Sequence, residues 1–262
     1  MEKNYIIDTH CHIDMIEDIS VKEILENAEN NSVKKIIIPS ADRSSFDKII
    51  ELAISYEQIY CMLGVFPEEA KTWNDNILDE IKNLAAKNKK IVGIGEIGLD
   101  YYWDKTFIDL QKEIFIKQIQ LANELNLPIN VHDREAHKDT FDIIKENNKT
   151  SKVVLHCFSG SIEFAKECIK EGWYISLGGV VTFKNAKKMK EVAENIDENY
   201  LLLETDSPYL TPVPYRGKPN QPAYTKFTAQ EIANLRQTTL EHIMEVTTQN
   251  AYKVFKFEER TT

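Results

Sequence analysis

The stretch that decides the fold is residues 128–158, PINVHDREAHKDTFDIIKENNKTSKVVLHCF. Two short apolar runs, PINVH and KVVLHCF, flank a polar stretch of helical length. A strand, a helix and a second strand in that order predict parallel pairing with a right-handed crossover.

The same alternation extends outward over the whole chain. Short runs rich in β-branched residues begin near Tyr5, Lys35, Tyr60, Ile91, Pro128, Lys152, Trp173 and Tyr200. Eight such units in 262 residues take about 33 residues each, which favours a (β/α)8 TIM barrel forming a single domain over residues 1–262. Residues 226–255 are predicted to form two closing helices. A doubly wound open sheet uses the same alternation and is the alternative.

Composition limits the class of protein. Lys and Arg number 32 and Asp and Glu 42, so the net charge is −10, which argues against nonspecific coating of nucleic acid. The four cysteines include no C-x-x-C pair and are too sparse for a disulfide scaffold. No apolar run approaches 18 residues and the first residues do not resemble a signal peptide. We therefore expect a cytoplasmic monomer with no membrane contact.

Polar residues that are unusual in buried strands gather where the predicted strands end. They are His10, His12, Glu96, His132, His156, Glu204 and Asp206. The carboxyl ends of barrel strands carry the active site. Alternation along a strand places His10 and His12 on one side, and likewise Glu204 and Asp206.

Four histidines and two carboxylates exceed the needs of one tetrahedral catalytic metal, and they suit two divalent ions bridged by a carboxylate. The predicted assignment is one ion on His10, His12 and Asp206, a second on His132 and His156, and Glu96 bridging them. Nitrogen and oxygen ligands without thiolate leave Mg, Mn, Zn, Co and Fe open.

Residues 93–98, GIGEIG, match the dinucleotide pattern G-x-G-x-x-G literally. A dinucleotide-binding loop turns directly from a strand into a helix, whereas here the next helix is predicted only near Thr106. We therefore expect no nucleotide cofactor, and we expect the glycines to let the backbone and Glu96 crowd the barrel mouth.

Several motifs resemble the TatD family of metal-dependent deoxyribonucleases. They are DTHCHID (Asp8–Asp14), GEIGLDYYWD (Gly95–Asp104), HDREAH (His132–His137), HCFSGS (His156–Ser161), ETDSPYLTPVPYRGKPNQP (Glu204–Pro222) and TTQNAYKVF (Thr247–Phe255). The resemblance implies a TIM barrel of the amidohydrolase superfamily and a divalent-metal hydrolase. The metal ligands that it implies are His10, His12, Glu96, His132, His156 and Asp206. One departure is Phe66, where many members have histidine in G-x-H-P, and it leaves the substrate scope open.

The predicted reaction is hydrolysis of a phosphodiester by a metal-activated water, with Asp206 and Glu96 as catalytic residues. Glu204 either orients a ligand or makes a buried hydrogen bond at the strand end. For substrate phosphate we name Arg134, Arg216 and Lys218, although Arg134 also suits a salt bridge at the rim. The aromatic side chains of residues 101–103 either stack a base or pack the loop.

The function predicted is a deoxyribonuclease that attacks DNA ends or single strands in the manner of an exonuclease. The alternative is a metal-dependent hydrolase of a small amide, lactone or phosphoester, because the superfamily shares barrel and ligands. Residues 182–190 carry +4 and residues 211–226 carry +3, so the rest of the chain carries −10 − 7 = −17. That distribution argues against tracking along duplex DNA and favours local attack.

Overall fold

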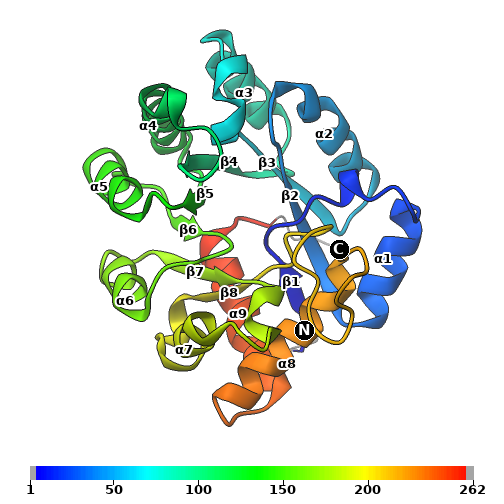
Figure 1. Ribbon diagram of the computed structural model, residues 1–262. Helices are drawn as coiled ribbons and strands as arrows, with labels where there is room; N and C mark the ends of the chain where they lie inside the picture. The colour runs from blue at the N-terminus through cyan, green and yellow to red at the C-terminus, as the bar shows by residue number, and fades with distance from the viewer. Residues whose placement is uncertain (1–3, 258–262) are drawn as a thin grey trace. The chain divides into compact units, whose positions relative to one another are not determined.

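The structure is a computed structural model that describes residues 4–257 (Figure 1). The strands within those residues are β1 (Ile6–Asp8), β2 (Val33–Pro39), β3 (Ile59–Leu63), β4 (Ile91–Asp100), β5 (Ile129–Arg134), β6 (Val153–Leu155), β7 (Tyr174–Leu177) and β8 (Leu201–Leu203). The α-helices are α1 (Val21–Asn30), α2 (Phe46–Ser55), α3 (Asn76–Lys87), α4 (Ile108–Leu125), α5 (His137–Asn147), α6 (Ile162–Lys170), α7 (Lys187–Asn195), α8 (Thr225–Leu235) and α9 (Leu240–Val254).

The strand order confirms the predicted (β/α)8 barrel. The sheet runs from β1 to β8 in the order of the sequence, whereas a doubly wound sheet reverses its order at a switch point. Every predicted strand begins within two residues of the observed one, and α8 and α9 are the two closing helices. No helix in residues 4–257 has both the length and the apolar character needed to cross a membrane.

The described residues divide into two compact units, one made of residues 4–38 and 156–253 and the other of residues 39–155 and 254–257. The single domain over residues 1–262 stays a prediction.

The unit of residues 39–155 contains β3 to β6 and the helices α2 to α5 (Figure 1). All residues of β3 and β4 are buried, as expected for parallel strands covered by helices. Gly98 has φ +142°, and a Cβ there would lie 2.0 Å from the carbonyl oxygen of His132. The glycine-rich motif thus lies inside β4, where it permits close backbone packing, and it is not a turn from strand into helix.

The unit of residues 4–38 and 156–253 contains β1, β2, β7 and β8 with α1 and α6 to α9. Serine caps begin two of its helices: Ser20 Oγ accepts a hydrogen bond from the Glu23 amide at 3.2 Å, and Ser161 Oγ accepts one from the Phe164 amide at 3.3 Å. β1 ends at Asp8 and β8 at Leu203. The polar residues predicted at the ends of these two strands therefore lie in the loops that follow them.

Candidate metal centre

The loops after β1 and β8 bring His10, His12 and Asp206 together. The Asp206 amide donates to the His10 carbonyl at 2.9 Å, and the His12 amide donates to the Ser207 carbonyl at 2.8 Å, so the backbones of the two loops are joined. The Nε2 atoms of His10 and His12 are 3.2 Å apart, and Asp206 Oδ1 lies 3.7 and 3.8 Å from them. Three donor atoms therefore surround one point.

The spacing of these donors fits one divalent ion. Two donors that each lie about 2.1 Å from an ion at a tetrahedral angle are about 3.4 Å apart. The three measured separations, 3.2, 3.7 and 3.8 Å, bracket that value. His10 is fully buried and His12 is 8% exposed, so the imidazoles are held in place by packing. These three residues could hold a metal ion.

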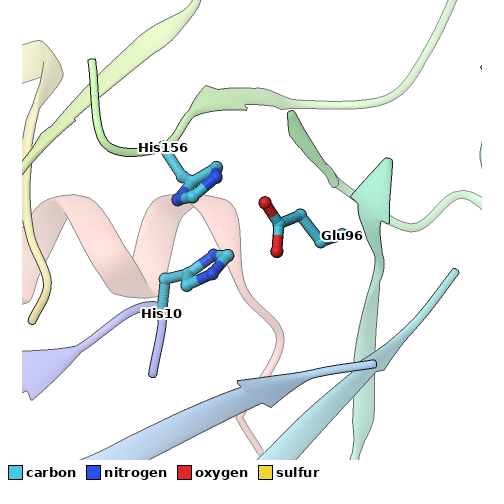
Figure 2. A group of neighbouring side chains, drawn as sticks. All are labelled: His10, Glu96 and His156. Atoms are coloured by element: carbon cyan, nitrogen blue, oxygen red, sulfur yellow. The ribbon is translucent and has the colours of Figure 1, made fainter. Parts of the chain in front are cut away.

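His156 follows β6 and its ring stacks on His10, with centroids 3.8 Å apart and an interplanar angle of 4°. Figure 2 shows the two rings face to face, and it also draws Glu96 from β4. The Glu204 carboxylate, fully buried, lies 3.6 Å from His156 Nδ1 and accepts a hydrogen bond from the Cys157 amide. A carboxylate on Nδ1 leaves Nε2 as the ring atom available to a ligand.

The pKa of the Glu204 carboxyl lies below its ordinary value although the group is fully buried. Burial raises the pKa of Glu204, but the hydrogen bond and charge of His156, together with the charge of His10, outweigh it and hold the pKa below its ordinary value. The left-handed backbone of Asp206, with φ +54°, takes it out of strand alternation. Glu204 therefore contacts His156, while Asp206 contacts His10 and His12.

The other unit carries a second cluster on β4 and β5. His132 Nδ1 lies 3.0 Å from Glu96 Oε1, and His132 Nε2 lies 2.9 Å from Asp100 Oδ2. Strand register produces this arrangement, because Gly98 pairs with His132 and Asp100 with Arg134. Residues two apart in a strand share one face, and this spacing relates Glu96, Gly98 and Asp100 in β4. Both carboxylates therefore face the His132 imidazole.

Asp100 is a functional candidate that the sequence reasoning missed. Burial raises the pKa of Asp100. The hydrogen bonds from His132 and from the amides of Tyr102 and Trp103 lower this pKa by more, so it lies below its ordinary value. The signal that could have found it is the i, i+2, i+4 spacing of 96, 98 and 100 within one strand. A carboxylate on the far nitrogen of a ligating histidine fixes the tautomer of the ring.

Asp8 is a second buried carboxyl that the sequence reasoning did not single out. It accepts hydrogen bonds from the Thr205 amide at 2.9 Å and the Thr205 hydroxyl at 2.6 Å. Burial raises its pKa to about 8, against the bonds from Thr205 that lower it. These bonds tie the end of β1 to the residues that follow β8, and so position the loops that carry the first three donors.

The residues predicted to bind substrate make contacts of their own. The Arg216 guanidinium lies 3.9 Å from the Phe183 ring centroid and donates to the Thr211 carbonyl at 2.9 Å. Lys218 Nζ lies 5.6 Å from the Tyr215 ring. The Arg134 guanidinium lies 3.9 Å from the Tyr102 ring centroid in a cation–π contact, and both of its suggested roles stay predictions.

Phe66, the departure from the histidine pattern, packs edge-on against His132 with centroids 4.8 Å apart. An apolar ring at this position supplies packing against the imidazole and no further nitrogen ligand. Glu68, two residues later, is partly buried, and burial raises the pKa of its carboxyl.

The comparisons with known proteins agree with one another. The family described as "TatD related DNase" matches residues 7–256. An uncharacterized metal-dependent hydrolase of Bacillus subtilis (strain 168), YabD, is 44% identical, with 96% of this chain and 99% of that protein covered. The Escherichia coli (strain K12) protein YcfH, also named an uncharacterized metal-dependent hydrolase, is 36% identical over 96% of each chain. The crystal structure of YJJV, a TatD homolog from Escherichia coli K12, has a TM-score of 0.91 at 30% identity and covers 97% of this chain and 98% of its own. The chain therefore belongs to the TatD family of metal-dependent hydrolases.

Proposed function

We propose that the protein is a divalent-metal-dependent deoxyribonuclease that hydrolyses phosphodiester bonds at DNA ends or in single strands. The observation that carries the metal-dependent part is the donor triangle of His10, His12 and Asp206, whose separations suit one ion. The DNA part is supported by the family, which is described as "TatD related DNase". Arg134, Arg216 and Lys218 remain the proposed phosphate contacts.

Two ions are proposed. Four imidazoles and two carboxylates exceed the needs of one catalytic metal and suit two divalent ions. The ligand set is His10, His12 and Asp206 for one ion, His132 and His156 for the other, and Glu96 between them. Nitrogen and oxygen donors suit Mg, Mn, Zn, Co or Fe. A bound divalent ion polarises the phosphoryl oxygen and lowers the pKa of water.

The protein side chains have separate tasks. Asp206, with a side chain that is 17% exposed, can reach solvent, so we assign it the proton from the attacking water. Asp100 and Glu204 hold the rings of His132 and His156 through the ring nitrogens that face away from the ligand position.

The test is cleavage of end-labelled single-stranded DNA by purified protein supplied in turn with Mg²⁺, Mn²⁺, Zn²⁺, Co²⁺ or Fe²⁺. We expect metal-dependent shortening that the double variant His132→Ala/His156→Ala loses. His242→Ala is the matched control, because that histidine pairs with Glu198, 3.0 Å away, and belongs to neither cluster. If no shortening occurs with any of the five metals, the deoxyribonuclease proposal is wrong, and small amides, lactones and phosphoesters become the substrates to assay.

A further inference from the structure

Two exposed aromatic rings and one guanidinium meet in the unit of residues 39–155. Tyr102 is 47% exposed and Trp103 is 65% exposed. Their rings meet edge to face with centroids 4.8 Å apart, and the Arg134 guanidinium lies 3.9 Å from the Tyr102 ring and 5.4 Å from the Trp103 ring. We call these three residues the aromatic platform.

The platform is fixed to the second metal-ligand cluster by one carboxylate. Asp100 Oδ1 accepts hydrogen bonds from the amides of Tyr102 at 2.8 Å and Trp103 at 3.3 Å. The other oxygen, Asp100 Oδ2, lies 2.9 Å from His132 Nε2. The neighbouring Tyr101 is held separately, because its hydroxyl donates to Asp139 at 2.8 Å. A ligand on the platform is therefore held directly beside a proposed metal ligand.

The chemistry of the platform points to a ligand with a flat ring and an anion. Exposing most of a tryptophan side chain to water is unfavourable, and such rings commonly bind partners. Within residues 4–257 the Arg134 side chain, which has five N–H donors, contacts the two rings and donates no hydrogen bond to a protein acceptor. A nucleotide matches both features, because its base presents a π face and its phosphate accepts bidentate bonds from a guanidinium.

We propose that the aromatic platform binds an unpaired base of the substrate on the Trp103 ring, with an adjacent phosphate on Arg134. This inference rests on the proposed deoxyribonuclease function and names the part of the substrate that is recognised. A base inside a duplex has both faces covered by its neighbours. The platform therefore selects single strands and frayed ends, and it tolerates any base, since every base has a π face.

The test is the binding of short oligonucleotides to metal-free protein, with tryptophan fluorescence as the readout. Trp103 is far more exposed than Trp173, which is only 5% exposed, so stacking on Trp103 should quench the emission. We expect oligo(dT) to quench and an abasic oligonucleotide of equal length not to quench. Trp73→Phe is the matched control and should keep the quench, because Trp73 bonds to Asp75 outside the platform.

Two variants separate the base from the phosphate. Trp103→Ala should weaken oligo(dT) binding about 5- to 150-fold and leave the abasic oligonucleotide unaffected. Arg134→Gln should weaken both. Unchanged binding of oligo(dT) by Trp103→Ala, or equal losses for both oligonucleotides, overturns the platform. Circular dichroism and melting of each variant check that the fold is intact.

DNA cleavage and oligo(dT) binding, both measured on the same protein, distinguish this inference from the nuclease proposal. If metal-loaded protein cleaves single-stranded DNA but Trp103→Ala binds oligo(dT) as the wild type does, the platform is wrong and the nuclease proposal stands. If Trp103→Ala loses base-dependent binding but the wild type cleaves no DNA with any metal, the nuclease proposal is wrong and the platform is a nucleotide-binding site.

Discussion

At the scale of single residues, Asp206 is the side chain on which the proposed chemistry depends most. Its Oδ1 lies 3.7 and 3.8 Å from two imidazole nitrogens. Asp206→Asn keeps the shape and removes the charge and the proton acceptor. We expect kcat for DNA cleavage to fall about 10²- to 10⁴-fold, the usual contribution of a positioned acid or base. The measurement is single-stranded DNA hydrolysis at saturating metal.

Asp197→Asn is the control for that change, because the Asp197 side chain accepts hydrogen bonds from Asn199. Its activity should equal that of the wild type. Turnover retained by Asp206→Asn, with metal bound and the melting temperature unchanged, would remove Asp206 from the proton transfer.

At the scale of elements, the pairing of β4 with β5 makes a prediction about Asp100. In Asp100→Asn the amide can donate to His132 Nε2 and so favour the tautomer that carries its proton on Nδ1, the nitrogen that faces Glu96. We expect the metal affinity to fall about 10- to 100-fold without loss of fold. The measurement is calorimetric titration of metal-free protein with Mn²⁺ or Zn²⁺.

Asp139→Asn is the matched control for Asp100→Asn. Asp139 lies in the same unit, where its carboxylate bonds the Tyr101 hydroxyl and the Lys112 ammonium. Its loss should leave metal affinity unchanged. Equal affinities for wild type and Asp100→Asn would show that His132 is oriented by packing alone.

The sequence predicts where the strands begin better than what happens after they end. Runs such as KVVL are local signals, so β6 begins at Val153 within one residue of its expected start. The loop containing Asp206 turns through a left-handed residue, which strand alternation does not anticipate. The role of Asp100 was missed because it depends on Gly98 pairing with His132, and one sequence does not reveal register between strands.

At the scale of the whole molecule, the net charge of −10 is unevenly distributed along the chain. Lys190 is paired with Glu231 at 2.6 Å, and Lys187 and Lys188 lie exposed on α7. Arg216 and Lys218, in the loop after β8, lie 3.9 and 5.6 Å from the ring centroids of Phe183 and Tyr215. The few local phosphate contacts, and with them the attack on ends and single strands, stay predictions.

Metal binding should also be visible in the stability of the whole chain. An ion that binds the folded chain and not the unfolded one stabilises it by about 2.7 kcal/mol at 100 times its Kd. For a chain of this size that raises Tm by roughly 5–10 °C per site. We expect EDTA to lower Tm and Mn²⁺ or Zn²⁺ to restore it, with two ions per chain by elemental analysis. His12→Ala should lose one ion and part of the shift, while His242→Ala keeps both. The two-ion centre is contradicted if the wild type binds only one ion, or if EDTA leaves its Tm unchanged.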